Sequence, residues 1–267
     1  MQSGMHGCGA AIHAAAKVEQ WGRWNDFLRD TVEGTKNVVS AARAARVRRL
    51  VHVSTEAVLA DGSPIVNADE SRSLPAKPNG FYPRSKGMAE RHVRGANRNG
   101  LETIVVRPRF VWGKGDTTLL PQLVAAARAG WVWFGDSRHR MSTCHVRNVS
   151  HGIRLALELG RPGEVYFLTD GEPVRFREFI GDLVGTQGVS VGERTAPLWL
   201  ADAFAAIGES IWSMLALKGG PPLTRTTMNL FFREVTLSDA KARRELGYQP
   251  VMSIEEGLRE LRGAAAS

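Results

Sequence analysis

The chain has 267 residues, 43% of them hydrophobic, and is long enough to bury a sizeable core as one large domain or two unequal ones. Its two cysteines, Cys8 and Cys144, have no metal-ligand spacing and provide no disulfide framework, and no secretory signal is recognisable, which indicates a reducing compartment. The net charge of +8 comes mainly from arginines in Ala/Arg-rich segments such as 41–49, where no aromatic residues intervene. That pattern is typical of a solvated helix face, so we expect a cytoplasmic protein that binds no nucleic acid and no metal.

The first predicted strand lies within residues 8–16, a continuous apolar run that opens into small residues. Such a run is typical of a parallel sheet covered on both faces. A helix is predicted from about Asn25 to Arg46, and a second strand from Arg48 to Val53. His13, near the end of the first strand, is on residue type alone better interpreted as a histidine of the core.

A tyrosine and a lysine four residues apart, Tyr82 and Lys86, follow a polar loop at 61–80. Pro83 favours a helix start here, so the two side chains share one helix face. A phenol has a pKa near 10, and lowering it by about three units takes roughly 4 kcal/mol. One cation at about 4 Å supplies about that much at an effective dielectric near 20. The pair therefore predicts a proton-transfer device, with Tyr82 as acid/base and Lys86 lowering its pKa.

Strands and helices continue to alternate after this motif. A third strand is predicted from Thr103 to Arg107, a helix from Leu119 to Ala129 and a late strand from Glu164 to Leu168. Strands that alternate with helices of ten or more residues indicate an α/β fold with a doubly wound parallel sheet.

Residues 197–217 are nearly long enough and apolar enough to span a bilayer, but Asp202 and Glu209 interrupt them. The two acids are seven residues apart and share one face, which favours an amphipathic helix packed in a lobe. An in-plane membrane helix is the alternative, and the lack of a lysine/arginine row argues against it.

The order of a hydroxyl-ended strand, Tyr-x-x-x-Lys and Arg107-Pro108 resembles the extended short-chain dehydrogenases/reductases, the NAD-dependent epimerase/dehydratase superfamily. Further motifs resemble its 3β-hydroxysteroid dehydrogenase branch: Val32-Glu33-Gly34-Thr35, Gly113-x-Gly115-Asp116, Thr169-Asp170-Gly171-Glu172-Pro173 and Leu246-Gly247-Tyr248-x-Pro250. Two positions depart from the family pattern. Thr31 replaces an asparagine, and Arg147 replaces an aspartate.

The resemblance implies a Rossmann-type sheet with a smaller C-terminal substrate lobe. Residues 1–110 correspond to part of the dinucleotide-binding domain, 145–170 return to it, and most of 111–267 form the lobe. The segment Gly4-x-x-Gly7-x-Gly9 aligns just before the fourth strand of the family, without the usual strand, glycine-rich turn and helix. We therefore expect an N-terminally truncated sheet whose edge is the strand beginning at Ala10.

The resemblance also implies the site. Tyr82 transfers the proton, Lys86 tunes it and contacts the nicotinamide ribose, and Thr55 hydrogen-bonds the substrate oxygen, with Ser54 as the alternative. The residues expected along the cofactor are His13, Ala14, Ala15, Lys86, Pro108 and Phe110. The cofactor is NAD, with NADP left open, because the residue that selects between them belongs to a strand absent from this sequence.

The implied function is oxidation or reduction of a hydroxyl or ketone on an apolar substrate, either a 3β-hydroxysteroid or sterol-like compound or a long-chain 3-hydroxy/3-oxo compound. Aromatic residues in the lobe favour apolar ligands: Trp199, Trp212, Phe231 and Phe232. One alternative is a nucleotide-sugar epimerase or dehydratase of the same superfamily, and another is a non-catalytic, truncated binding protein. The sequence leaves open whether residues 197–217 make peripheral contact with a membrane and whether the protein forms a homodimer.

Overall fold

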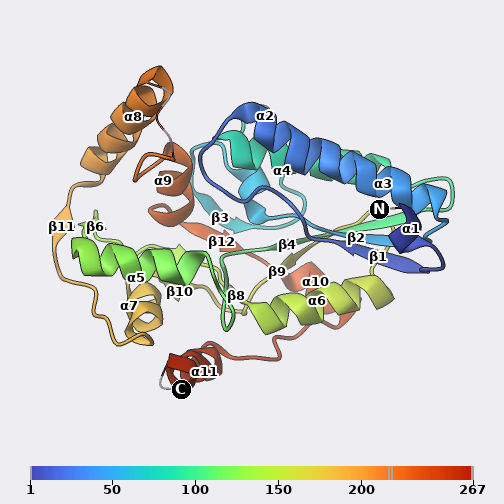
Figure 1. The fold of residues 1–267 in the computed structure, drawn as a ribbon. Coiled ribbons are helices and arrows are strands. Elements are labelled where there is room, and N and C mark those ends of the chain that lie inside the picture. Colours follow the sequence, from blue (N-terminus) through green and yellow to red (C-terminus); the bar gives the residue numbers. More distant parts are fainter. Residues whose placement is uncertain (1, 216, 218, 266–267) are drawn as a thin grey trace.

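The largest sheet of the protein is parallel and has four strands in the order β1-β2-β4-β9 (Figure 1). These are β1 (Ala10–His13), β2 (Arg49–Val53), β4 (Glu102–Pro108) and β9 (Val165–Leu168). The structure is a computed structural model that describes residues 2–215, 217 and 219–265. The predicted α/β fold with a parallel sheet is confirmed, and the second, third and late strands lie where the apolar runs place them.

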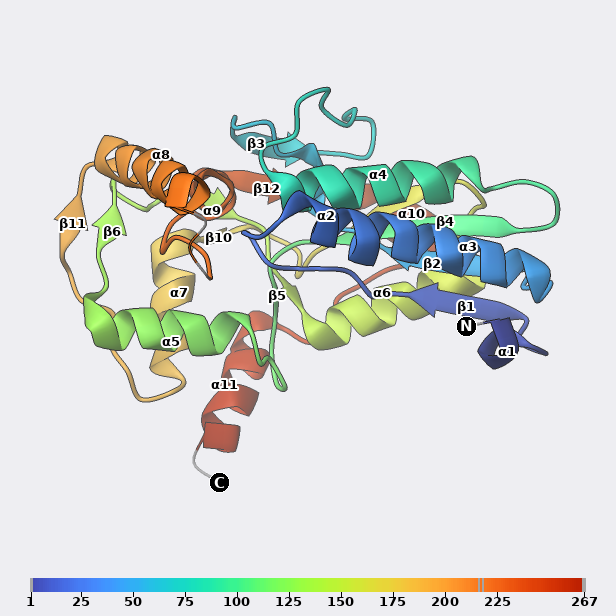
Figure 2. The ribbon, with the colours of Figure 1, turned by 45° about the horizontal axis from the view of Figure 1, so that its top comes forward.

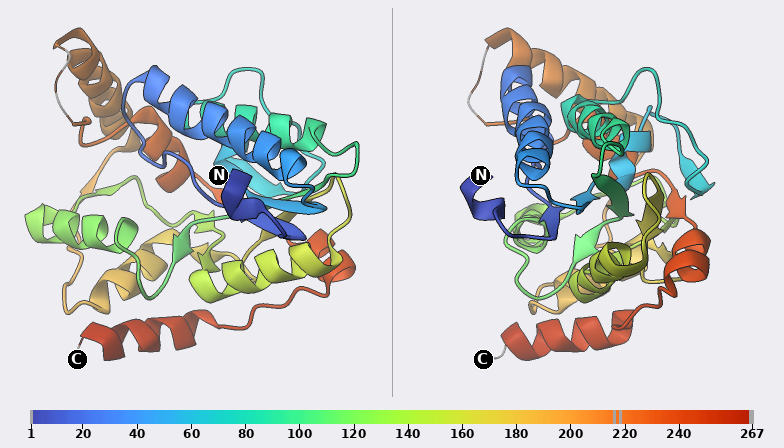
Figure 3. Two further views of the ribbon diagram at one scale, coloured as in Figure 1. Left: turned by 45° about the vertical axis from the view of Figure 1, so that its right-hand side comes forward. Right: turned by 90° about the vertical axis from the view of Figure 1, so that its right-hand side faces the viewer.

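Helices cover both faces of this sheet, as the view along the strands shows (Figure 3). Helices α3 (Gly34–Ala44) and α4 (Phe81–Gly95) pack on one face, and α6 (Val146–Leu159) packs on the other. Successive residues of a strand point to opposite faces. Leu50 and Val105 accordingly join the core under α3 and α4, while Val51 and Ile104 join the core against α6.

The helix predicted from Asn25 to Arg46 is present as one continuous rod. It consists of α2 (Trp24–Phe27), a π-helical segment η1 (Leu28–Glu33) and α3 (Figure 2). The π-helical segment was not predicted. It contains the buried Thr31, whose hydroxyl accepts a hydrogen bond from the backbone N–H of Lys17 at 3.0 Å. The hydroxyl that replaces the family's asparagine thus ties the helix to the loop after β1.

Strand β1 is the edge of the sheet, as expected, and pairs only with β2 among the described residues. It is shorter than the predicted run, and a short helix α1 (Gln2–Met5) precedes it. The expectation of a strand buried on both faces is wrong, because of its four residues His13 alone is buried and Ile12 is 51% exposed.

A second sheet, ordered β10-β7-β12-β3, joins the two halves of the chain. Its strands are β3 (Ile65–Ala68), β7 (Arg140–Met141), β10 (Val174–Arg175) and β12 (Val235–Leu237). Two further sheets have two strands each. They pair β5 (Val111–Trp112) with β8 (Cys144–His145), and β6 (Trp133–Phe134) with β11 (Thr195–Ala196). The remaining elements are η2 (Glu56–Leu59), α5 (Leu119–Gly130), α7 (Phe176–Gly185), α8 (Leu198–Leu215), α9 (Arg225–Phe231), α10 (Ala240–Leu246) and α11 (Ile254–Ala265). Helices α5 and α7 enclose a core around Trp112 and Trp133.

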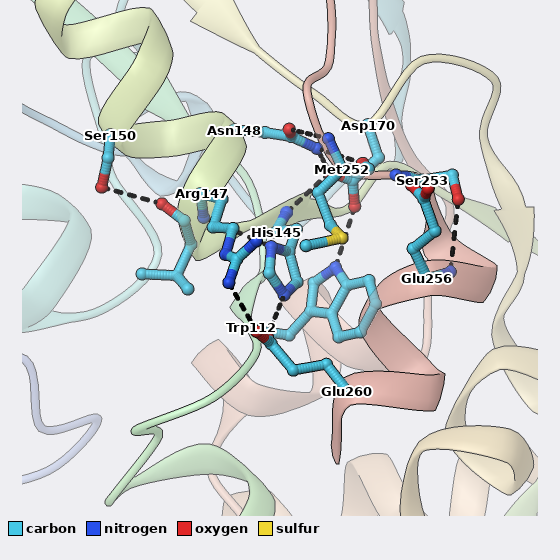
Figure 4. Close-up of polar contacts among 11 residues, drawn as sticks. Trp112, His145, Arg147, Asn148, Ser150, Asp170, Met252, Ser253, Glu256 and Glu260 are labelled. Carbon is cyan, nitrogen blue, oxygen red and sulfur yellow. Dashed lines mark hydrogen bonds and ion pairs between the residues drawn. The ribbon is translucent and has the colours of Figure 1, made fainter. Parts of the chain in front are cut away.

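Asp170 organises the C-terminal part of the chain (Figure 4). Its carboxylate accepts hydrogen bonds from the Trp112 indole at 2.8 Å, the His145 backbone at 2.6 Å and the Asn148 amide at 2.7 Å. Asn148 in turn binds the backbone of Met252, and Arg147 pairs with Glu260 of α11 at 2.8 Å. Arg147, which replaces the aspartate of the family pattern, therefore forms part of the contact that holds α11. The Thr169-Asp170 motif has a structural role here.

Helix α8 confirms the helix predicted at 197–217 but reverses its expected orientation. Its two acids point toward arginines near α9, because Asp202 pairs with Arg233 at 3.3 Å and Glu209 with Arg225 at 3.5 Å. The apolar face is exposed instead, at Trp199, Phe204, Ile207, Ile211, Met214 and Leu215. The helix packs in the lobe, as the preferred interpretation predicted, but it does so through Ala201 and Ala205 against α9 and not through its large apolar residues. None of the described helices is both long and apolar enough to cross a bilayer.

Candidate active site

A cleft of about 1530 Å³ opens at the carboxyl ends of β2 and β4, beside the first turn of α4. Four of the predicted site residues line it: Ser54, Thr55, Tyr82 and Lys86. Ala14, Pro108 and Phe110 line it as well, whereas His13 and Ala15 are not among its lining residues. The carboxyl ends of neighbouring parallel strands meet at one edge of a sheet, which is why residues so far apart in sequence come together here.

Tyr82 lies in the first turn of α4, which the chain enters through Gly80 at φ 105°. The pKa of its phenol is raised to about 12, first by burial and then by the negative charge of Glu56, and a hydrogen bond with the Thr55 hydroxyl opposes this. Lys86 is not among the groups that shift this pKa, and its expected lowering of the Tyr82 pKa stays a prediction. At neutral pH the Tyr82 phenol is therefore protonated and can donate its proton.

Lys86 is held away from that role by the sheet. Its ammonium donates a hydrogen bond to the backbone carbonyl of Val53 at 2.7 Å. Burial lowers the pKa of Lys86 to about 8, opposed by Glu90 one turn further along α4. Its amine thus lines the cleft at the end of β2, where it can serve as a donor to a ligand.

The two hydroxyls at the end of β2 have different partners. Ser54 Oγ donates to Glu90 Oε2 at 2.7 Å, inside the interface between α4 and the sheet. Thr55 Oγ1 donates to Glu56 Oε2 at 2.7 Å and accepts from the Ala57 backbone at 3.2 Å, capping η2. The hydroxyl of Thr55 is the one linked to Tyr82.

Two buried ion pairs that the sequence analysis missed surround these hydroxyls. Arg107 binds Glu90 with two hydrogen bonds, at 2.6 and 3.0 Å, and Arg109 lies 3.1 Å from Glu56. The sequence contains a weak indication of each ion pair. Glu90 stands four residues after Lys86 on the same helix face, and Glu56 directly follows the hydroxyl pair.

His13 lies under α3, where its Nε2 is 2.9 Å from the Thr35 hydroxyl. Its ring is 5.2 Å from that of His52, between centroids, and burial together with the charge of Lys86 lowers the pKa of His13 to about 4. This placement supports the interpretation of a core histidine. The cofactor role of His13 and Ala15 stays a prediction.

Comparison with known sequences decides the family. Residues 1–198 match the family described as the 3-beta hydroxysteroid dehydrogenase/isomerase family. The chain belongs to this family. The resemblance carried by the sequence motifs is confirmed, and so is the class of enzyme, a short-chain dehydrogenase/reductase.

Two proteins similar in sequence to this chain are named for the reduction of a ketone. The chain is 48% identical to a 4-hydroxy-2-methyl-3-oxo-4-farnesyl-3,4-dihydroquinoline-1-oxide ketoreductase from Stigmatella aurantiaca, over 99% of this chain and 79% of the relative. It is 34% identical to a 2-alkyl-3-oxoalkanoate reductase from Stenotrophomonas maltophilia, over 98% of this chain and 82% of the relative.

The fold of this family member also matches a solved nucleotide-sugar enzyme. A dTDP-glucose 4,6-dehydratase from Streptomyces venezuelae, solved as a double mutant with NAD bound, superposes with a TM-score of 0.75 at 25% identity. The match covers 98% of this chain and 74% of that one. The expected Rossmann-type fold is thereby confirmed.

Proposed function

We propose that this member of the 3-beta hydroxysteroid dehydrogenase/isomerase family is a reductase of an apolar ketone, with Tyr82 as the proton donor. The observation that carries the proposal is the half-buried phenol of Tyr82 on the wall of a large cleft, beside the Lys86 ammonium and with its pKa raised to about 12. An acid that stays protonated at neutral pH suits protonation of the oxygen formed when a carbonyl is reduced.

The nicotinamide cofactor predicted from the sequence is supported by the dTDP-glucose 4,6-dehydratase structure, which shares the fold and has NAD bound. The cleft fits such a group. Ala14 and Ala16 place small side chains on its wall, and Lys86 offers an ammonium donor at the end of β2. When bound, the nicotinamide supplies the hydride. Lys86, Ala14, Pro108 and Phe110 would hold the cofactor beside Tyr82.

The cleft supports an apolar substrate. Trp212, Leu230 and Phe231 line it together with Phe110, and such walls suit ligands with a few polar groups that fix their orientation. Of the other two aromatic residues singled out in the sequence, Trp199 is exposed and Phe232 packs on Phe134 and Phe176. We propose a long-chain 3-oxo compound, in keeping with the 2-alkyl-3-oxoalkanoate named for one relative, or a sterol-like ketone, in keeping with the family description.

A substrate panel with Tyr82→Phe tests this function. The wild-type protein should reduce long-chain 3-oxo compounds or sterol-like ketones and leave nucleotide sugars unchanged. Tyr82→Phe should lower turnover by roughly 10² or more, with cofactor affinity nearly unchanged. Turnover of a nucleotide sugar alone would favour the epimerase or dehydratase alternative, and cofactor binding without any turnover would favour the binding protein.

We also propose that the exposed face of α8 rests on a lipid surface, from which an apolar substrate enters the cleft. The face carries no charged residue, because the two acids of the helix are paired with arginines on its other side. The same helix reaches the cleft, because Trp212 of α8 lines it. It lies at the end of the molecule opposite the edge strand β1 (Figures 1 and 2).

Co-sedimentation with neutral phosphatidylcholine vesicles tests this contact. Phe204→Asp should abolish binding, and salt should change the wild-type binding little, because the contact is apolar. Val66→Asp, at an equally exposed apolar residue of β3, is the matched control and should bind normally. A lipid-independent dimer that Phe204→Asp dissociates would instead assign the face to a second copy of the chain.

A further inference from the structure

Exposed arginines gather where α3 and α4 end side by side. The two ends are in contact, because the Arg43 guanidinium donates a hydrogen bond to the backbone carbonyl of Ala96 at 3.1 Å. Among the described residues, none of these guanidinium groups forms an ion pair with an acid. We call this region the arginine surface, and its members are Arg43, Arg46, Arg48, Arg91, Arg94 and Arg98.

The arginine surface is strongly positive because the segments that carry it contain almost no acids. Residues 34–48 have none, and the one acid within 81–100 is Glu90. The carboxylate of Glu90 is buried and paired with Arg107 at 2.6 Å, so it does not offset the charge outside. A surface of one sign attracts partners of the opposite sign over a distance of about the Debye length.

A neighbouring histidine is affected by this positive charge. The pKa of His92, on α4, is lowered first by burial and then by the charges of Lys36 and Arg43 on α3, with Glu33 opposing them. The cations of the two helices therefore act together on one region, which agrees with the contact between Arg43 and α4.

Stabilisation of the helix ends accounts for only part of the arginine surface. Cations in the last turn of a helix interact favourably with the negative end of its dipole. This explains Arg43 and Arg94, which lie in the last turns of α3 and α4. It does not explain Arg48 and Arg98, which lie outside both helices.

The arginine surface and the apolar face of α8 belong to the same side of the molecule. Figures 1 and 3 show α8, α3 and α4 along one side and α11 on the other. The α2 end of the rod is the end nearer to α8, and it carries Trp24, whose ring lies 4.3 Å below the Arg84 guanidinium. Phe81, 40% exposed, packs on Trp24 with 5.5 Å between ring centroids. Aromatic rings and arginines with apolar stems are typical of membrane–water interfaces.

We propose that the arginine surface binds the headgroups of anionic lipids when the apolar face of α8 rests on a membrane. The inference builds on the lipid contact proposed for α8 and does not depend on the reaction that the cleft performs. A lipid surface offers apolar chains and negative charge in one plane, so it matches both features of this side. Nucleic acid would match the arginines but not the apolar face beside them.

Co-sedimentation with two kinds of vesicle tests the proposal. Adding phosphatidylserine at about 30% to phosphatidylcholine should strengthen binding of the wild-type protein, and salt at about 0.5 M should remove the increase. Arg94→Gln with Arg98→Gln should weaken binding to the anionic vesicles by roughly 10-fold or more, because each arginine near such a surface contributes about fivefold. Binding to neutral vesicles should not change. Neither side chain has a partner in the described part of the chain, so the fold should be kept.

Arg259→Gln with Arg262→Gln is the matched control, because it removes the same charge from two exposed arginines of α11, on the opposite side. It should bind both kinds of vesicle as the wild type does, and an equal loss in this control would overturn the proposal. So would equal wild-type binding to neutral and anionic vesicles. Binding of a DNA duplex that Arg94→Gln with Arg98→Gln loses, without a preference for anionic vesicles, would assign the surface to nucleic acid instead.

Phe204→Asp separates this inference from the contact proposed for α8. It should lose binding to neutral vesicles and keep binding to anionic vesicles at low salt. If the wild-type protein binds anionic vesicles alone, the arginine surface is retained and the apolar contact of α8 is rejected.

Discussion

Two buried glutamate–arginine pairs lie side by side at the ends of β2 and β4, and they have different surroundings. Glu90 and Arg107 form a two-bonded pair between α4 and the sheet, with Ser54 as a third partner. Glu56 and Arg109 border the cleft, and the Arg109 Nε has no hydrogen-bond partner among the described atoms. Near-identical pairs thus lie in the helix–sheet interface in one case and beside the cleft that Tyr82 lines in the other.

The difference shows that pairing alone does not assign a role to a buried charge. A buried pair is weak grounds for inferring stability, because desolvation offsets much of the attraction, whereas breaking it leaves an uncompensated charge. What separates the pairs is the third group that each holds. Ser54 is bound into the helix–sheet interface, and Thr55 is bound beside Tyr82.

The largest expected effect is on folding, through the pair between α4 and the sheet. Glu90→Ala leaves Arg107 buried without its carboxylate and should lower the free energy of unfolding by about 3–5 kcal/mol. Urea denaturation measures this. Glu102→Ala removes the partner of Arg49 from a half-exposed pair on the same strands and should cost at most about 1 kcal/mol. Equal losses in the two variants would contradict the assignment of Glu90 to the fold.

The next effect distinguishes the roles of the Thr55 and Ser54 hydroxyls. Thr55→Val removes the group next to Tyr82 and leaves Glu56 without that donor, so turnover should fall by roughly 10². Ser54→Ala should lower turnover by less than about 10-fold and cost about 1 kcal/mol of stability, the net value of one hydrogen bond. Steady-state kinetics and thermal melts on both variants measure this. A larger loss of turnover in Ser54→Ala would transfer the catalytic role to Ser54.

The smallest effect concerns buried groups that have no ionic partner. The pKa of His13 is lowered to about 4 and that of His52 is also lowered, in both cases mainly by burial. Between about pH 6.5 and 4 the unfolded chain binds protons on these imidazoles and the folded chain does not. The free energy of unfolding should therefore decrease as the pH falls through this window, by on the order of 2 kcal/mol for His13.

Denaturation at a series of pH values checks this acid sensitivity. His13→Gln should flatten the dependence, while the exposed His6→Gln should leave it as in the wild type. A steep dependence that survives in His13→Gln would place the sensitive group elsewhere.

The sequence by itself determined the fold class, the family and seven residues of the cleft. Alternating strands and helices predicted the parallel sheet, and Pro83 placed the start of the helix that carries Tyr82 and Lys86. These features are readable because they depend on local spacing and on the period of apolar residues.

Only the tertiary structure decided how charges and surfaces are used. Adjacency on a helix face suggested that Lys86 lowers the pKa of Tyr82, but burial and Glu56 raise it, and both depend on elements distant in sequence. In the same way, the spacing of Asp202 and Glu209 identified one face of α8. Each acid pairs with an arginine, Glu209 with one 16 residues away and Asp202 with one 31 residues away. These pairs turn the acidic face inward and leave the apolar face exposed. Burial and pairing arise from segments that meet only in three dimensions, and a periodic pattern along one segment carries no information about them.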